Sequence, residues 1–412
     1  MMLRLPLFLF LSLFLAGPTF AASKETINAQ FRIWLESALW PQAQGEGISR
    51  STFDSALGSV SVNLDLPDLV LPGQKPKPPK NQHQAEFQSP ANYFNEKSIS
   101  ALVSGGQARA KQYAKALAAI EKKYGVPRQY LLAIWGRESG YGTVKIPYDA
   151  FDVLATKAFM SSRKDFFQVE LLAALKILEK GYMDRAGMKT SWAGALGQPQ
   201  FMPSSYLKYA VDFDGDGKRD IWNSAPDTLA SIANYLVQYG WQKGRGWGAE
   251  VALPDGVSCA LEGRDQGKAG SEWSAMGILR QDGQPFPAKD LKSENLLLLP
   301  SGRFGPVFLA TPNFYVIKTY NISDLYALFI GHVADRIAGG KSEFAEPWRP
   351  IDKMLRSDID AMQKALQNKG YDIGNADGLP GFKTRRSIGD WQSKNGLAQT
   401  CYPSNELAGQ VK

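Results

Sequence analysis

The sequence is poor in the residues that bind transition metals or serve as histidine bases. Only two histidines and two cysteines occur among its 412 residues. A zinc site built from several His or Cys ligands therefore cannot form, which excludes zinc amidases and zinc peptidases. His332 lies in an apolar helical pattern, and we expect it to pack in the core. A Ser-His-Asp triad is correspondingly disfavoured.

Long apolar runs are missing after the first residues. Residues 1–22 have a positively charged start, an apolar run over 7–15 and a small-residue end, which is the pattern of a secretory signal peptide. No later stretch supplies about 18 uninterrupted apolar residues, so we expect no membrane span. A lipid anchor is not expected either, because Pro18 stands where lipid attachment would need Cys. We predict an exported, periplasmic protein.

Charge and cysteine content leave two questions open. The formal net charge is +7, and a basic balance of this size suits nucleic acid, anionic lipid or acidic wall peptides. Charge alone does not choose among these partners. Cys259 and Cys401 can pair in an oxidising compartment, but the sequence does not show their geometry.

The pattern along the chain predicts a mainly α-helical protein. Helical periodicity dominates residues 99–240 and returns at 323–337. Between about 251 and 312, short apolar pieces separated by Gly, Pro and Asp indicate a small β-rich insertion. The chain exceeds the usual size of a single core, which favours a large domain plus a smaller one.

These observations give a division of the chain into four parts. We expect a signal peptide at 1–22, a large domain at 23–341, a linker at 342–352 and a small domain at 353–412. The linker contains the sequence Glu-Pro-Trp-Arg-Pro, which is unfavourable for a regular helix.

One carboxylic acid lies on an apolar helix face. A helix-start signal stands at Pro127, because proline is well tolerated in a first helical turn. Four residues then recur at i, i+3, i+4 and i+7 and share one face: Leu131, Ile134, Trp135 and Glu138. Burial raises the pKa of a carboxyl group, which can then protonate a leaving oxygen near neutral pH. The alternative is that Glu138 pairs with Arg137 or a backbone amide and only ends a packed helix.

Two motifs around this acid resemble one family. Glu138 is followed by Ser-Gly-Tyr-Gly, and residues 191–203 read Ser-Trp-Ala-Gly-Ala-Leu-Gly-Gln-Pro-Gln-Phe-Met-Pro. Small residues let a ligand approach the backbone closely, and the amides can bind sugar hydroxyls. The first motif resembles the catalytic helix end of lysozyme-like lytic transglycosylases. The second resembles the Gly-Gln-Phe-Met-Pro signature of the membrane-bound lytic transglycosylase B family, and the resemblance covers most of residues 24–340.

The resemblance implies a lysozyme-like catalytic domain and a set of site residues. It makes Glu138 the catalytic acid and base, with Ser191 and Gln200 orienting its carboxyl or the bound sugar. The further residues that it implies for glycan binding are Tyr93, Phe201, Tyr235, Tyr320, Asn321 and Tyr326.

The resemblance also implies a reaction and its partners. An ordinary glycosidase needs two carboxylates at a fixed separation, and no second carboxylate stands out in the matched motifs. The implied route uses Glu138 to protonate the bond between N-acetylmuramic acid and N-acetylglucosamine. Glu138 then deprotonates the muramic C6 hydroxyl, which closes a 1,6-anhydro ring. The implied partners are peptidoglycan glycan strands and other cell-wall enzymes, and not nucleic acid. A water-using muramidase and a non-catalytic wall-binding scaffold are the alternatives.

An acidic loop has the spacing of a calcium-binding EF-hand loop. Counting from Asp212, acids stand at positions 1, 3, 5 and 9, and glycine stands at position 6. Position 12 is Asn223 where a bidentate Glu is usual, and Asp227 can supply the missing oxygen. The expected ligands are Asp212, Asp214, Asp216, the Lys218 carbonyl, Asp220 and Asp227. We expect a structural Ca²⁺ with no cofactor required for catalysis; the alternative is a solvated turn without an ion.

The last part of the chain has the pattern of three short helices. Gly370-Tyr371-Asp372, Asp377-Gly378, Thr384-Arg385 and Trp391-Gln392 resemble the small peptidoglycan-binding domain of many wall enzymes. Such a module tethers a catalytic domain to the wall and raises its local substrate concentration. A helical bundle without a ligand is the alternative.

Overall fold

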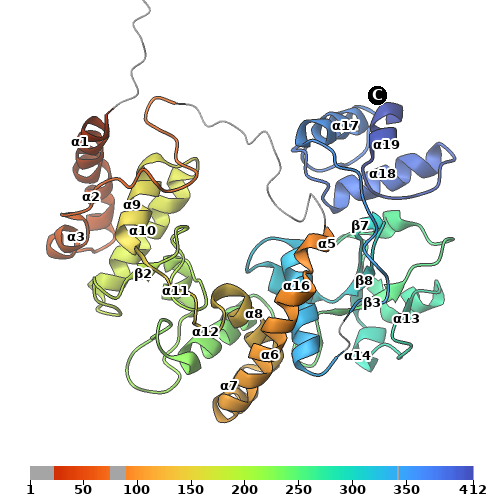
Figure 1. Cartoon of the computed structure of the whole chain (residues 1–412), viewed down its shortest axis with the longest axis horizontal. Coiled ribbons are helices and arrows are strands. Elements are labelled where there is room, and N and C mark those ends of the chain that lie inside the picture. Colours follow the sequence, from red (N-terminus) through yellow and green to blue (C-terminus); the bar gives the residue numbers. More distant parts are fainter. Residues whose placement is uncertain (1–22, 75–89, 341–342, 412) are drawn as a thin grey trace, which may run out of the picture.

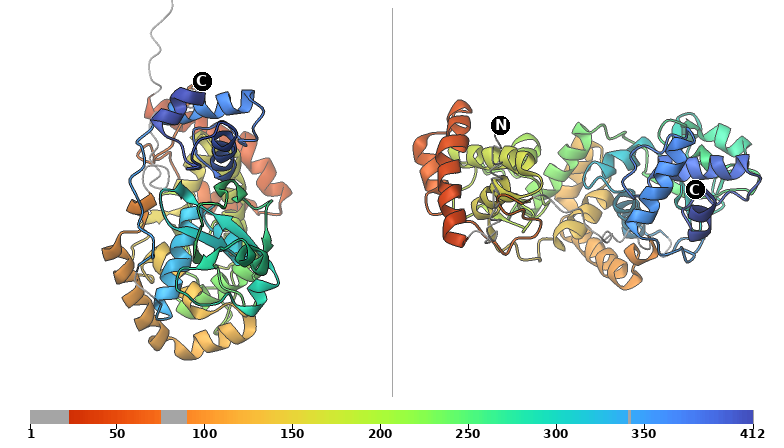
Figure 2. Two further views of the ribbon diagram at one scale, coloured as in Figure 1. Left: turned by 90° about the vertical axis from the view of Figure 1, so that its right-hand side faces the viewer. Right: turned by 90° about the horizontal axis from the view of Figure 1, so that it is seen from above.

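The computed structural model describes residues 23–74, 90–340 and 343–411. The expected signal peptide at 1–22 lies outside these ranges. Two arms rise from a helical base, and the N-terminal and C-terminal helices lie at opposite ends of the molecule (Figures 1 and 2). None of the helices in the described ranges is long and apolar enough to cross a membrane.

The N-terminal arm consists of capped helices. Its elements are α1 (Lys24–Trp34), the π-helical turn η1 (Leu35–Leu39), α2 (Trp40–Gly45), α3 (Arg50–Leu57), α9 (Ala150–Met160), α10 (Lys164–Glu179) and the strands β1 (Tyr148–Asp149) and β2 (Lys189–Thr190). Ser23 and Ser49 accept hydrogen bonds from the first turns of α1 and α3, which satisfies amides that a helix start leaves unpaired. Phe31 packs edge-on against Phe159 at 5.5 Å, which joins α1 to α9.

The base of the molecule surrounds helix α8. Its elements are α5 (Pro90–Tyr93), α6 (Glu96–Gln112), α7 (Ala114–Tyr124), α8 (Arg128–Ser139), α11 (Pro203–Tyr209), α12 (Ala225–Gln238), α15 (Pro312–Lys318) and α16 (Asp324–Ile337). Helices α6, α7, α12 and α16 all contact α8. Every residue from Tyr130 to Gly136 is therefore buried, whereas the sequence predicted a single apolar face.

His332 on α16 is buried, as the sequence predicted. Its ring lies 4.3 Å from the ring of Phe344 and 6.2 Å from that of Phe94. His332 therefore packs among aromatic rings, and it is distant in sequence from the predicted catalytic motifs.

The expected β-rich insertion is a five-stranded antiparallel sheet. The strand order is β4 (Lys268–Ala269), β6 (Glu294–Leu298), β8 (Val307–Ala310), β3 (Gly248–Ala252) and β5 (Leu279–Arg280). The elements η2 (Cys259–Leu261), α13 (Gly270–Ala275), α14 (Ala288–Leu291) and β7 (Pro300–Arg303) complete this region. Its buried residues, including Trp273 and Leu297, form a core of their own.

The C-terminal unit has three helices, which confirms the predicted fold class. They are α17 (Arg356–Asn368), α18 (Phe382–Lys394) and α19 (Asn405–Val411), and they enclose a separate core that includes Leu366 and Ile388. The unit lies directly beside the sheet (Figure 1). Cys259 and Cys401 form a disulfide, which answers the question that the sequence left open.

Candidate active site

Helix α8 ends in three consecutive left-handed residues. Gly140, Tyr141 and Gly142 have φ angles of 56°, 62° and 78°, and two of them are glycines that adopt this conformation without steric cost. Tyr141 folds back so that its hydroxyl donates to the Leu102 carbonyl at 2.5 Å. A Cβ added at Gly136 would lie 2.5 Å from the Tyr141 ring. The turn therefore depends on small residues, and it ends α8 one residue after Glu138.

The Glu138 carboxyl is half-buried and hydrogen-bonded. The Tyr326 hydroxyl on α16 donates to Glu138 Oε1 at 2.6 Å. Burial raises the pKa of Glu138 to about 7, although the Tyr326 bond and the charge of Arg137 act in the opposite direction. A carboxyl with this pKa keeps a large protonated fraction at neutral pH, so it can donate a proton and then accept one.

Arg137 does not pair with Glu138. Its guanidinium lies over the rings of Tyr93 and Phe329, at 5.0 and 4.8 Å from their centroids, and it donates to the Tyr93 hydroxyl. The guanidinium therefore faces these rings instead of forming the ion pair with Glu138 that this part of the alternative required.

Four aromatic residues that were expected to bind glycan form a cluster beside Glu138. Ring centroids lie 5.6 Å apart for Phe201 and Tyr235, 4.8 Å for Tyr235 and Tyr320, and 6.3 Å for Tyr320 and Tyr326. Phe201, Tyr235 and Tyr326 are buried. The hydroxyls of Tyr235 and Tyr320 donate to the backbone carbonyls of Thr319 and Pro199. These side chains support the site from the core, with Tyr320 only partly accessible.

The other expected glycan-binding residues lie nearer the surface. Asn321 is exposed, and Tyr93, Ser191 and Gln200 are half-buried. Ser191 Oγ accepts from the Ala195 amide, and the Gln200 amide donates to the Gly197 carbonyl. In this structure the hydrogen bond to the Glu138 carboxyl comes from Tyr326 rather than from these two residues.

Trp192 is an exposed aromatic side chain that our sequence reasoning missed. Its side chain is 47% exposed, and the Lys157 ammonium lies 5.1 Å from its ring centroid. Tryptophan side chains are on average highly buried in folded proteins. Its place directly after Ser191 in the second motif was the signal that could have identified it.

Gln198 connects the helix end to the neighbouring loop, and it too was absent from our candidates. Its Oε1 accepts from Trp135 Nε1 at 2.8 Å, and its Nε2 donates to the Trp222 carbonyl at 2.8 Å. A groove of about 290 Å³ lies here, lined by Gln198, Trp222, Gly142 and Ser139, the residue after Glu138. The acid of raised pKa therefore directly precedes, in sequence, a residue that lines this groove.

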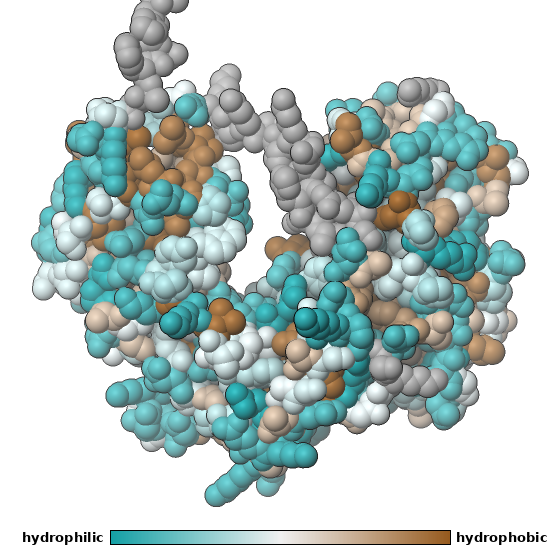
Figure 3. All heavy atoms as spheres, viewed as in Figure 1, coloured by the Kyte–Doolittle hydropathy of each residue, from teal (hydrophilic) through white to brown (hydrophobic). Residues whose placement is uncertain are grey.

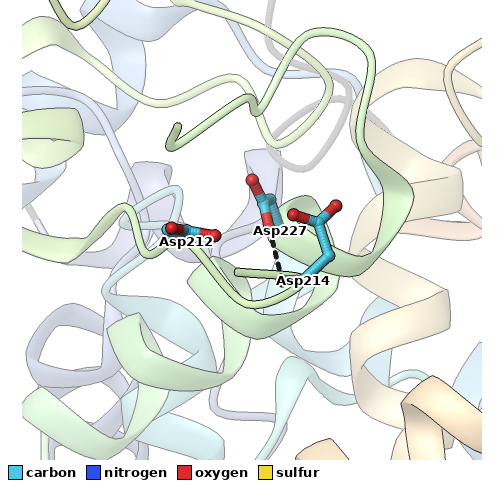
Figure 4. A group of neighbouring side chains, drawn as sticks. All are labelled: Asp212, Asp214 and Asp227. Atoms are coloured by element: carbon cyan, nitrogen blue, oxygen red, sulfur yellow. Dashed lines mark hydrogen bonds between the residues drawn. The ribbon is translucent and has the colours of Figure 1, made fainter. Parts of the chain in front are cut away.

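The acidic loop brings three of its predicted ligands together. Carboxylate oxygens of Asp212, Asp214 and Asp227 lie within 4.8 Å of one another, and they point toward a common centre (Figure 4). Asp227 also accepts the Phe213 and Asp220 amides, which fixes the loop. Asp227 therefore lies beside Asp212 and Asp214 at the start of the loop, and its role as a substitute for position 12 stays a prediction.

The remaining predicted ligands make other contacts. Asp216 accepts the backbone amide of Lys218, and Asp220 accepts the amides of Trp222 and Asn223. Oxygen donors of this kind suit Ca²⁺. The three converging carboxylates fit the hard-cation chemistry that the sequence predicted.

A mainly helical domain that holds a glutamic acid of raised pKa at the end of a buried helix has the arrangement of a lysozyme-like enzyme that acts on glycan. The sequence model of the transglycosylase SLT domain matches residues 30–335, and that of the putative peptidoglycan-binding domain matches residues 356–409. The chain belongs to this lytic transglycosylase family, and it is an enzyme that acts on peptidoglycan.

Similar proteins cover most of the chain. Membrane-bound lytic murein transglycosylase B of Escherichia coli (strain K12) is 32% identical over 281 residues, which are 67% of this chain and 73% of the relative. SltB3 from Pseudomonas aeruginosa, solved in complex with NAG-anhNAM-pentapeptide, is 38% identical with a TM-score of 0.82, over 92% of this chain and 99% of that chain. SLT35 from Escherichia coli, solved in complex with calcium, is 26% identical with a TM-score of 0.57, over 76% of this chain and 94% of that one.

Proposed function

We propose that this lytic transglycosylase forms 1,6-anhydromuramic acid ends and that Glu138 is its single acid and base. The observation that carries the proposal is the half-buried Glu138 carboxyl, whose pKa burial raises to about 7. Near neutral pH both protonation states of such a group are populated, and a one-acid mechanism uses both. The complex of SltB3 with NAG-anhNAM-pentapeptide also supports anhydro ends.

The proposed reaction has two proton transfers. Neutral Glu138 gives its proton to the glycosidic oxygen as the bond from the muramic C1 to that oxygen breaks. The resulting carboxylate takes the proton of the C6 hydroxyl, whose oxygen forms a new bond to C1. Water is neither consumed nor produced, and Glu138 ends in its starting state. Holding the hydroxyl and C1 in one sugar makes this closure intramolecular.

The other predicted site residues take two proposed roles. Phe201, Tyr235 and Tyr326 position Glu138 and the loop around it from the core, because they are buried. Tyr93, Tyr320, Asn321, Ser191 and Gln200 are accessible enough to contact sugar directly. We add Trp192 to this second group, since its exposed ring can stack on a sugar face.

Three further features belong to the proposal. A calcium ion held by Asp212, Asp214 and Asp227 stiffens the loop next to the groove, which the calcium complex of SLT35 supports. The signal-like sequence at 1–22 directs export to the periplasm, where the substrate lies. The C-terminal unit holds the enzyme on peptidoglycan, and other cell-wall enzymes are its expected partners.

The test is product analysis of digested sacculi. Purified protein should release muropeptides whose masses are lower by one water than those of hydrolytic products, and Glu138→Gln should fold and release none. Glu25→Gln, which removes a charge from the exposed surface of α1, is the matched control and should keep full activity. Reducing ends in place of anhydro ends would identify a muramidase, and normal yield from Glu138→Gln would remove Glu138 from the mechanism.

A further inference from the structure

The C-terminal unit is held in a fixed position against the sheet. In addition to the disulfide, Arg385 on α18 forms a two-pronged ion pair with Glu262, at 2.8 Å from Nε to Oε2 and 2.5 Å from Nη2 to Oε1. Both side chains are almost completely buried, and a buried pair with such geometry is lost only at a large cost in free energy. Arg386 pairs with Asp265 nearby. The unit is therefore a rigid extension of the catalytic domain rather than a free tether.

A groove of about 300 Å³ lies where this unit meets the loop between α15 and α16. Lys318, Ile322 and Asp324 line its catalytic-domain side, and Asn375, Asp377 and Lys383 line the other. We call it the junction groove. Its volume is at the lower end of roughly 300–1,000 Å³ that is usual for small-ligand sites.

The loop that borders the junction groove also belongs to the proposed active site. Tyr320 packs against Tyr326, the partner of Glu138, while Ile322 two residues later lines the groove. Two residues of chain span at most about 7 Å. Ile322 therefore lies within about 7 Å of Tyr320 along the chain, and one loop contributes to both the aromatic cluster and the junction groove.

Ile322 is an unusual residue for such a position. It is 85% exposed and has a φ of 55°, a left-handed conformation that a β-branched residue rarely adopts. Backbone strain of this kind costs roughly 1–3 kcal/mol and is concentrated at ligand-binding sites. An exposed, strained, apolar side chain at the edge of a groove is best explained by a ligand that covers it.

We propose that the junction groove binds the stem peptide of the glycan strand that the active site cleaves, an inference that rests on the proposed function. Stem peptides carry small apolar side chains, carboxylates and an amine. The groove offers the matching groups: apolar Ile322, the ammonium groups of Lys318 and Lys383, and the carboxylates of Asp324 and Asp377. Lys318 and Lys383 already pair with Asp324 and Asp372, but partly exposed pairs exchange partners at little cost.

The experiment compares two substrates with one set of full-length variants. Asn375→Trp fills the groove from its exposed rim, and Lys383→Ala removes one of its ammonium groups from the side of the C-terminal unit. Asn368→Trp, at the exposed end of α17 and outside the groove lining, is the matched control. The substrates are glycan strands with their stem peptides and the same strands after an amidase has removed them. Both groove variants should lower kcat/KM about tenfold for peptide-bearing strands and leave it unchanged for bare strands, and the control should behave as wild type.

Other outcomes overturn the proposal. An equal loss of kcat/KM on both substrates would show that the groove binds sugar or that the variants disturb the catalytic loop. No loss of kcat/KM on either substrate would show that the groove does not contribute to substrate binding. The peptides released by the amidase give an independent binding test by calorimetry with Glu138→Gln protein. If the peptides bind and Asn375→Trp abolishes this binding, the junction groove is supported as the peptide site. This conclusion would hold even if the wild-type protein formed no anhydro product, because the absence of that product would contradict only the proposed function.

Discussion

Replacing Glu138 should stabilise the folded protein at alkaline pH. The carboxyl of an unfolded chain titrates near 4.5, and burial raises its pKa to about 7 in the folded protein. Between these values the folded state binds more protons than the unfolded state, so the free energy of unfolding decreases as pH rises. The loss of stability from burying the ionised Glu138 carboxylate is absent below about pH 4.5 and complete above about pH 7. The change in pKa corresponds to about 3 kcal/mol, which is an upper bound because the side chain is partly solvated.

Urea unfolding of wild type and Glu138→Gln at about pH 4 and pH 8.5 measures this effect. Glutamine still accepts the Tyr326 hydrogen bond but carries no charge. We expect equal stability at the lower pH and a variant that is more stable by 1–3 kcal/mol, as an order of magnitude, at the higher pH. Glu406→Gln, which removes an exposed carboxylate, should show no such difference. A Glu138→Gln protein whose stability relative to wild type does not change with pH would refute the desolvation of this carboxyl, and with it the basis of the mechanism.

Three other perturbations test separate parts of the structure. Tyr326→Phe removes a hydrogen bond that lowers the pKa of Glu138. The alkaline limb of the profile of kcat/KM against pH should therefore shift to higher pH, and kcat/KM should fall about tenfold. An alkaline limb at the wild-type pH would contradict this role of Tyr326. Joint replacement of Cys259 and Cys401 by Ser removes a disulfide between residues 142 apart and should lower the free energy of unfolding by up to about 5 kcal/mol. Equal stability of the reduced and the oxidised wild-type protein would contradict this expectation. Calcium at about a hundred times its Kd should stabilise the wild-type protein by about 2.7 kcal/mol and should not stabilise Asp214→Asn. If calcium left the melting temperature of both proteins unchanged, the result would argue against the ion site.

Local sequence patterns were enough to predict the position of Glu138 at a helix end, the acidic loop, and which regions are helical or β-rich. Pro127 before an apolar helical stretch predicted α8 and placed Glu138 at its end, because helix starts and periodicity depend on neighbouring residues. The spacing of Asp212 and Asp214, with Asp227 as a substitute ligand, likewise needed only a short stretch of chain. Gly, Pro and Asp breaks between short apolar pieces were enough to predict the β-rich insertion.

Tertiary structure decided which groups act on the acid and which remain accessible. Tyr326 is 188 residues from Glu138 in sequence and reaches it only because α16 packs on α8, so no local pattern could name it as the partner. The sequence also could not show that Phe201 and Tyr235 are buried, since an aromatic residue suits a core and a sugar site equally. The fixed attachment of the C-terminal unit depends on Glu262 and Arg385, which lie 123 residues apart. The raised pKa of Glu138 has the same origin, because desolvation is the sum of all the atoms that the fold brings around one carboxyl. The overall shape follows too: the face in Figure 3 is hollowed between the two arms, which only the packing of distant helices could produce.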